Sequence, residues 1–201
     1  MDHRDPPAPP SQVSDEALQT VTVGERTAHD APVTLVDYDP AWPARFEREA
    51  RRIRAALGEA VVRLEHTGST SVPGLAAKPI IDITLVVPDS ADEAGYVPRL
   101  EAAGYVLRIR EPHWHEHRLL KGPDADVNLH VFSPSSAEFQ RMVGFRDWLR
   151  THDDDRELYE QTKRALAART WRHVQHYADA KTAVVEEIIA RAGLPAGTRF
   201  D

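Results

Sequence analysis

A stretch in the first half of the chain, HTGSTSVPGLAAKPIID, gathers residue types that bind anions and metal ions in proteins. A turn of small residues stands ahead of a lysine and of an aspartate that opens an apolar run, and the candidate site residues are Gly68, Ser69, Thr70, Lys78 and Asp82. Glycine lets the backbone turn sharply, and the two hydroxyl residues after it offer side-chain oxygens and consecutive backbone N–H groups. The pattern therefore predicts a loop that can hold phosphate.

A simpler interpretation of the same stretch is an ordinary turn. Thr70 or Ser71 could cap a short helix at residues 75–78, after a second turn at Pro73 and Gly74. The stretch is not a Walker loop, because no Gly-Lys-Ser/Thr follows the first glycine at the required spacing. On the turn alone, both interpretations stay open.

Two histidines are expected near Asp82. His66 directly precedes the turn, and His130 lies in the strand-like segment VNLHV, where it points the same way as Asn128. Asp82 and His130 could hold one divalent metal ion, Mg²⁺ or Mn²⁺, and His66 could aim at the same cleft as a third catalytic candidate. A satisfied structural histidine is the alternative for His66.

A further histidine row occurs in PHWHEHRLL, at positions 113, 115 and 117. Alternation places the three side chains on one face if the segment is a strand. Such a row can bind a metal ion, but we favour a solvated strand face near a loop. Arg118 would then face the covered side of the sheet, which makes it a further ligand-binding candidate.

Cations on the inward faces of the C-terminal helices could supply a wall for phosphate. Lys163 and Lys181 each lie on an apolar helical stripe, and Arg146 precedes Asp147 in the segment FRDWLR. Basic residues that recur on inward faces of an otherwise acidic protein favour an anion site. The alternative is that Asp147 forms an ion pair with one of these cations.

Strand patterns dominate the first two thirds of the chain, and helical patterns dominate the rest. Strand candidates are residues 33–35, 60–66, 79–88, 105–110, 115–122 and 126–132, and helix candidates are residues 43–57, 89–103, 135–152, 155–170 and 176–193. This order predicts an α+β fold: a mixed β-sheet with helices on one face and a C-terminal helical segment. We interpret residues 1–31 as a disordered leader, 32–195 as the folded domain and 196–201 as a tail.

The composition excludes several classes of protein. The chain has 201 residues, no cysteine and a formal net charge of -7. A mildly acidic body argues against sequence-independent nucleic-acid binding, and the lack of cysteine excludes disulfides and thiolate metal sites. No apolar run approaches a bilayer span, and the N-terminus lacks the apolar core of a signal peptide, so we expect a cytoplasmic protein without membrane contact.

Longer motifs give the chain a family resemblance. Tyr38-Asp39-Pro40 with Trp42, the stretch up to Asp82, NLHVF, FRDWLR and two Tyr-x-x-x-Lys helices together resemble the GrpB-like family over residues 33–193. The resemblance implies a nucleotidyltransferase-type fold, in which a Gly-Ser backbone cradles triphosphate and strand acids hold two metal ions. At the positions of the second and third acids this chain has Thr84 and His130. Similar domains occur fused to dephospho-CoA kinase.

Three functions follow from these patterns and from the resemblance. The first is a site for a small phosphorylated molecule or nucleotide, with nucleotidyl or phosphoryl transfer as the reaction if the protein is an enzyme. The second is a non-catalytic partner or folding module, related to the domain fused to dephospho-CoA kinase. The third is a single-metal hydrolase that uses His66, Asp82 and His130.

Overall fold

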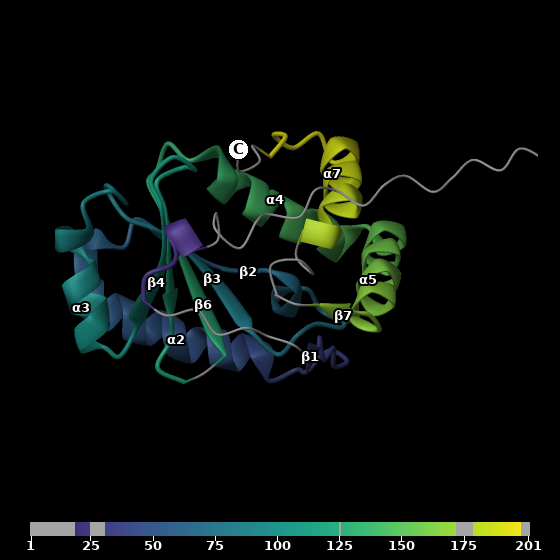
Figure 1. Ribbon diagram of the computed structural model, residues 1–201, viewed down its shortest axis with the longest axis horizontal. Coiled ribbons are helices and arrows are strands. Elements are labelled where there is room, and N and C mark those ends of the chain that lie inside the picture. The colour runs from purple at the N-terminus through teal and green to yellow at the C-terminus, as the bar shows by residue number, and fades with distance from the viewer. Residues whose placement is uncertain (1–18, 25–30, 125, 172–178, 198–201) are drawn as a thin grey trace, which may run out of the picture.

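The structure is a computed structural model that describes residues 19–24, 31–124, 126–171 and 179–197. Its centre is a five-stranded mixed sheet of order β2-β3-β6-β5-β4, with the strands β2 (Arg63–Thr67), β3 (Ile81–Val86), β4 (Val106–Glu111), β5 (His117–Lys121) and β6 (Val127–Phe132). Only β3 and β6 within this sheet run parallel, and the other neighbours are antiparallel. The predicted α+β, nucleotidyltransferase-like fold class is confirmed (Figure 1).

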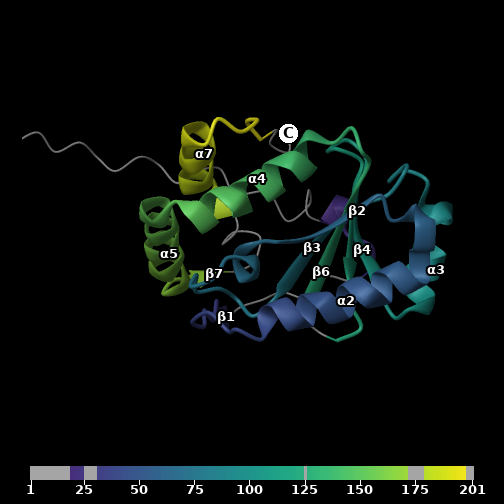
Figure 2. The same ribbon diagram turned by 180° about the vertical axis from the view of Figure 1, so that it is seen from behind.

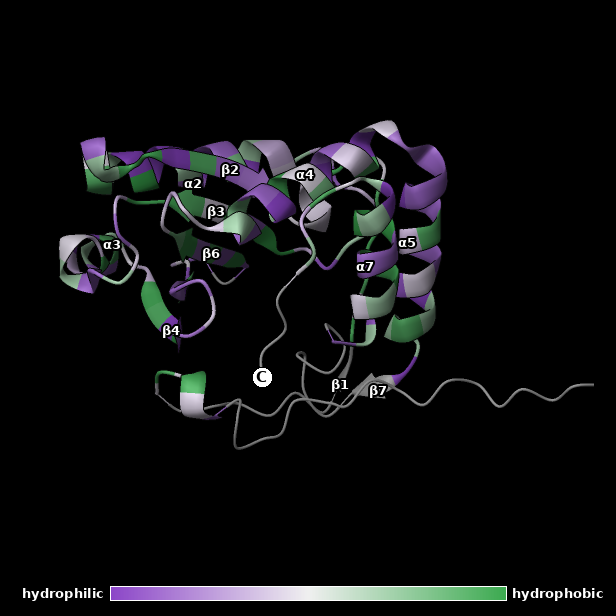
Figure 3. Ribbon diagram, turned by 90° about the horizontal axis from the view of Figure 1, so that it is seen from above, coloured by the Kyte–Doolittle hydropathy of each residue, from purple (hydrophilic) through white to green (hydrophobic). Residues whose placement is uncertain are grey.

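Several α-helices and a small second sheet surround these strands. The helices are α2 (Trp42–Leu57), α3 (Val97–Ala102), α4 (Ala137–Thr151), α5 (Asp153–Ala167) and α7 (Thr182–Arg191), and the second sheet pairs β1 (Ala31–Pro32) with β7 (Thr170–Trp171). Figure 3 shows α5 and α7 side by side, and the two helices are in contact. None of the helices in the described part of the chain is long and apolar enough to cross a membrane.

One face of the sheet carries the hydrophobic core. Alternation along β3 directs Ile81, Ile83 and Leu85 to this face, where they are buried with α2 residues such as Ala50 and Ile53. Figure 2 shows α2 lying along the sheet. The buried side chains of α2, among them Ala50, Ile53 and Leu57, lie along one stripe of the helix. The apolar face anchors the strands and leaves the opposite face for polar residues.

The opposite face of the sheet is polar at its centre. In the register of β2, β3 and β6, Asp82 lies between Thr67 and Asn128, and Thr84 lies beside His130. The helix α4 crosses above this face (Figure 1). Helices therefore cover both faces of the sheet, whereas the sequence pattern predicted helices on one face only. The second face is covered because α4 of the C-terminal helical segment packs on it.

Several predicted elements are shorter than expected or lie elsewhere. The expected strand at 33–35 is replaced by β1 and by an isolated bridge between Val36 and Ala77. The expected helix at residues 75–78 is absent, since the helical turn lies earlier, at Ser69–Ser71. The expected helix at 89–103 is reduced to a 3₁₀ turn, Glu93–Gly95, and the six residues of α3.

The histidine row is not on a strand face. Residues 112–116 form a turn, and His115 and Glu116 adopt positive φ angles of 52° and 51°. Alternation therefore fails in this segment, and only His117 of the three histidines lies in β5. The expectation of three histidines on one face was wrong because positive φ angles redirect side chains without a signal in the residue pattern.

Part of the expected leader is built into the fold. The Val23 N–H donates to the Arg108 carbonyl over 2.8 Å, Thr22 bridges to Ile109, and the Val23 side chain packs against the core. These residues cover β4, an edge strand whose backbone groups would otherwise lack partners on that side. The rest of the expected leader, residues 1–18 and 25–30, lies outside the described residues.

We expect Val23→Asp to lower the free energy of unfolding by about 1–3 kcal/mol, because the carboxylate would lie against apolar side chains. The matched control is Val62→Asp, whose side chain is 49% exposed. Urea unfolding should show a change below about 0.5 kcal/mol for the control. Equal losses in the two variants would show that the contact between residues 19–24 and β4 adds no stability.

Candidate functional site

The turn after β2 packs directly against Asp82. Gly68 has a φ of +64°, and a Cβ atom added there would lie 2.4 Å from the Asp82 Oδ2 atom. Only glycine fits this position, because other residues would be strained in the backbone and would collide with the carboxylate. The turn and the aspartate on β3 are thus held at van der Waals contact, as the spacing between them suggested.

Polar side chains on the neighbouring strands orient the Asp82 carboxylate. The Asn128 Nδ2 atom donates to Asp82 Oδ1 over 2.7 Å, and the Lys121 ammonium donates to Asn128 Oδ1. Burial alone would raise the pKa of Asp82, but the contacts with His130 and Asn128 and the charge of Lys78 lower it below its usual value. Asp82 is therefore an anion at neutral pH.

The four lysines of the chain form a group linked by their charges, and Lys78 and Lys121 act directly on Asp82. Of 25 basic residues only four are lysines, Lys78, Lys121, Lys163 and Lys181. Burial, followed by the charge of Lys181, lowers the pKa of Lys78 to about 8. The charge of Lys121 acts on Lys78 in the same direction. The side chains therefore lie close enough to repel one another, with Asp82 as an opposite charge nearby.

Lys163 is the most deeply buried of the four, with 2% of its surface exposed. Its ammonium donates to the Ala76 carbonyl and, over 3.1 Å, to the Ser69 hydroxyl, and it lies 4.7 Å from the centroid of the Tyr159 ring. On the same helix, Glu160 accepts the Ala76 N–H over 3.0 Å. Burial, followed by the charge of Lys181, lowers the pKa of Lys163 to about 7. Lys163 thus joins α5 to the turn.

The sequence pattern predicted one continuous helix over residues 176–193, but Lys181 lies at a break in it. Lys181 is the N-cap residue directly before α7, and it is partly exposed. Tyr177, which the same stripe included, lies outside the described residues. The break brings the Lys181 charge near both Lys78 and Lys163, since it lowers the pKa of each.

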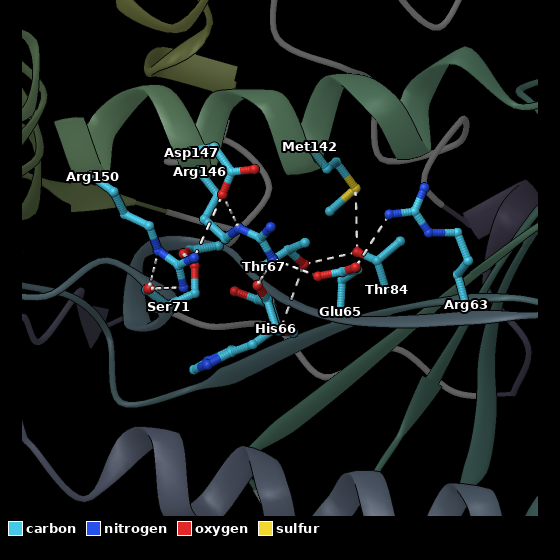
Figure 4. A network of polar contacts seen from close by, with 12 residues as sticks. Arg63, Glu65, His66, Thr67, Ser71, Thr84, Met142, Arg146, Asp147 and Arg150 are labelled. Carbon is cyan, nitrogen blue, oxygen red and sulfur yellow. Dashed lines mark hydrogen bonds and ion pairs between the residues drawn. The ribbon is translucent and has the colours of Figure 1, made fainter. Parts of the chain in front are cut away.

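His66 lies on the face of the sheet opposite Asp82. Its ring stacks on Phe46 with centroids 4.9 Å apart, and its Nε2 atom is 3.1 Å from the Thr70 hydroxyl, which donates to the Ile80 carbonyl. Figure 4 shows the ring pointing toward α2 and away from α4. Burial lowers the pKa of His66 to about 4. The expectation that His66 aims at the Asp82 cleft is corrected, because β2 alternation turns it toward the core, and the Thr70 hydroxyl is likewise occupied.

The arginines of α4 clamp the backbone of the turn instead of facing an open site. Arg146 donates to Glu65 over 2.9 Å, to the His66 carbonyl over 2.8 Å and to Asp147 over 2.8 Å. Arg150 donates to the Ser71 carbonyl (Figure 4). Arg146 is therefore paired with acids, as in the alternative interpretation, and it holds the backbone ahead of the turn in place.

Arg118 is also away from the Asp82 site. It lies on β5, two strands from β3, where its Nε atom is 2.5 Å from Glu93 and its Nη1 atom donates to the carbonyls of Glu116 and His117. Its role in the structure is to hold the turn before β5. In the register of β5 and β6, Arg118 pairs with Val131 of the core, so it faces the covered side as predicted but lies on the face opposite Asp82, and the expectation of a ligand-binding role is corrected.

The side chains around Asp82 fit an anion better than a divalent cation. His130 Nε2 is 3.8 Å from Asp82 Oδ1, and Thr84, at the position of a second acid, bonds to the Thr67 hydroxyl over 2.8 Å. No group of three or more His, Asp or Glu side chains in the described ranges is placed to hold a metal ion. Two ligands beside four lysines make a poor site for Mg²⁺ or Mn²⁺.

Lys121 and Asn128 are site residues that the sequence pattern did not predict. Lys121 pairs with Asn128 in the register of β5 and β6, which brings both to the polar face beside Asp82. Alternation had grouped Asn128 with His130, but the pairing of β5 with β6 is not visible in a single strand. The signal available in the sequence was that only four of its 25 basic residues are lysines.

Comparisons with known proteins agree on one family. A family model described as GrpB protein matches residues 32–191. The UPF0157 protein BH1888 of Halalkalibacterium halodurans is 62% identical over 179 residues, which cover 89% of this chain and 92% of that protein. The crystal structure of the conserved protein GrpB from Enterococcus faecalis has a TM-score of 0.71 and 32% sequence identity, over 79% of this chain and 96% of that chain.

A second group of relatives is longer than this chain. A dephospho-CoA kinase of Mycolicibacterium paratuberculosis is 30% identical over 188 residues, which cover 81% of this chain but 46% of the kinase. A dephospho-CoA kinase of Mycobacterium bovis is 31% identical with the same partial coverage of its own length, 46%. The similarity is therefore to one part of each kinase.

Gly68→Ala should reduce stability more than the matched change Gly74→Ala. Both glycines have positive φ angles, but nothing lies within 4 Å of a Cβ atom added at Gly74. Backbone strain of about 1 kcal/mol is common to both variants, and the Gly68 variant must also displace the Asp82 carboxylate. Chemical unfolding should give a loss at least about 1 kcal/mol larger for Gly68→Ala. Equal losses would mean that the turn does not press on Asp82.

The lowered pKa of Lys163 predicts a pH dependence. In unfolded protein this lysine keeps its proton up to about pH 10.4, whereas the folded protein releases it near pH 7. Between these values the unfolded state binds more protons, so stability rises with pH by up to about 1.4 kcal/mol per pH unit.

Unfolding of wild type and Lys163→Met should therefore be compared between about pH 6 and pH 10. The variant should lose stability relative to wild type as the pH rises, while the exposed control Arg51→Met on α2 keeps a constant difference, because a guanidinium does not titrate in this range. A constant difference for Lys163→Met as well would contradict a lowered Lys163 pKa.

Proposed function

The chain belongs to the GrpB family, and we propose that its Asp82 site binds the phosphates of a small molecule, with nucleotides as the leading class. The observation that carries the proposal is the convergence of all four lysines on one partly buried place in an acidic protein. Like charges that are desolvated together raise the free energy of the ligand-free protein. A bound polyanion would relieve this repulsion.

The residues divide the work of binding. Lys78, Lys121 and Lys181 would neutralise phosphate charge, and the turn at Gly68 and Ser69 would offer backbone N–H groups. The Asp82 carboxylate would accept a hydrogen bond from a ligand hydroxyl or from a water molecule. Asp82 is held in place for this role by Asn128 and is 26% exposed on its side chain.

If the protein is an enzyme, phosphoryl or nucleotidyl transfer to a small molecule is the reaction that suits these groups. Lysines stabilise charge that develops on phosphate oxygens. Mg²⁺ or Mn²⁺ would have to arrive with the phosphates, since Asp82 and His130 alone offer too few ligands. The single-metal hydrolase is not favoured, because His66 lies on the other face of the sheet.

A second candidate function rests on the kinase relatives. A chain similar to about half of a dephospho-CoA kinase could serve as a non-catalytic partner or folding module. This role requires no ligand in the Asp82 site. It predicts that charge-removing variants in the site leave phosphate binding unchanged, because none occurs.

Isothermal calorimetry of the purified chain tests the proposal. The probes are pyrophosphate, ATP and dephospho-CoA, each with and without Mg²⁺, and the variants are Lys78→Met and the control Arg48→Met on α2. We expect Lys78→Met to weaken binding by about 10- to 150-fold, as for a lost charge-assisted hydrogen bond of 1.5–3 kcal/mol, and the control by less than about twofold. Equal affinities in both variants, or no binding of any probe by wild type, would overturn the proposal.

A further inference from the structure

A chain of four side chains crosses the polar face of the sheet and ends at Asp82. The His117 Nδ1 atom lies 2.5 Å from Glu111 Oε2, and its Nε2 atom lies 3.0 Å from His130 Nδ1. The second nitrogen of His130, Nε2, lies 3.8 Å from Asp82 Oδ1. Every ring nitrogen in the chain therefore faces a partner, and the residues come from β4, β5, β6 and β3 in the order of the sheet.

One end of this row of four side chains is buried, and the other end is partly exposed. Glu111 and His117 are 7% and 4% exposed, whereas the side chains of His130 and Asp82 are 22% and 26% exposed. Trp114 and Phe132 pack on the His117 ring with centroids 5.2 Å and 4.9 Å away. Apolar side chains of α4 complete this cover, namely Phe139, Met142 and Val143. A proton on Glu111 can therefore reach solvent or a ligand through the histidines.

The hydrogen bonds allow two arrangements that differ by one proton. In the first, protonated Glu111 donates to His117 Nδ1, His117 Nε2–H donates to His130 Nδ1, and His130 carries its proton on Nε2. In the second, Glu111 is ionised, both histidines carry their proton on Nδ1, and His130 Nε2 has a free electron pair. Both arrangements keep each histidine neutral and satisfy each hydrogen bond.

We propose that Glu111, His117 and His130 form a proton relay that delivers one proton to the Asp82 site and takes it back at His130 Nε2. In delivery, the Nε2–H bond of His130 breaks as a ligand oxygen takes the proton. His117 Nε2–H then gives its proton to His130 Nδ1, and Glu111 gives its proton to His117 Nδ1. Glu111 ends as a carboxylate, and uptake from a ligand hydroxyl reverses each step. His130 is the catalytic group, and Glu111 and His117 are positioning residues.

Burial favours the neutral forms that the relay requires. It raises the pKa of Glu111 to about 8 and lowers the pKa of His117 well below its usual value. The other groups that act on His117 are the Arg118 charge and, whenever they are protonated, His130 and His115, and each of these lowers the pKa of His117 further. Glu111 therefore holds its proton near neutral pH and loses it a little above neutral pH. Because a ligand is needed to use the proton, a catalytic role rests on the proposed phosphate site.

Nitrogen-15 NMR of the imidazole rings in the full chain tests the relay. Chemical shifts show which ring nitrogen carries the proton. Between about pH 6.5 and pH 9.5 we expect His117 and His130 in wild type to move their protons from Nε2 to Nδ1 together, with one midpoint. Glu111→Gln cannot ionise and should hold both rings in one tautomer throughout, whereas exposed His152 should behave alike in both proteins.

Two results would overturn the relay: rings that change tautomer at separate midpoints in wild type, or an exchange that persists in Glu111→Gln. If that variant does not fold, the wild-type titration alone decides, since tautomers that stay fixed across the range also exclude the relay. The experiment needs no ligand. A wild-type protein that fails to bind phosphates would therefore defeat the proposed function without deciding the relay, and the two failures are distinguishable.

Discussion

The crowding of positive charge around a single aspartate is the constraint on which this structure depends. The four lysines lie on β5, on α5, directly before α7 and in the loop before β3, and Lys78 and Lys121 act directly on Asp82. Burial lowers the pKa of three of them, Lys78, Lys121 and Lys163. Such an arrangement is unfavourable in a ligand-free protein and is held only by the surrounding fold. The repulsion between these desolvated lysines is the physical reason to expect a bound anion there.

The surrounding elements of the fold hold Asp82 and the turn beside it in position. The apolar face of the sheet, packed on α2, sets the position of β3 and so of Asp82. From the other side, Arg146 and Arg150 of α4 clamp the carbonyls of the turn, and Glu160 and Lys163 of α5 bind both sides of the Ala76 peptide. The turn is therefore fixed by side chains from two helices, and Gly68 lets it lie against the carboxylate.

The sequence predicted what depends on local pattern and missed what depends on tertiary pairing. Alternation identified β3 and β6, and the glycine turn ahead of Asp82 is recognisable from residue types alone. The face of His66 was misjudged because one residue of register decides whether a β2 side chain meets α2 or α4. The break at Lys181, the positive φ angle of His115 and the contact of Lys121 with Asn128 leave no periodic signal, because they arise from contacts between distant segments.

NMR titration of the lysine side chains tests the central claim most directly, because only four lysines contribute signals. With ¹³C-labelled lysine, the ε-carbon shifts report each pKa in the folded protein. The account predicts midpoints near 7 for Lys163 and near 8 for Lys78 without ligand, and a rise of both when pyrophosphate is added. Four lysines that all titrate at about the usual 10.4, with and without pyrophosphate, would contradict a desolvated anion site.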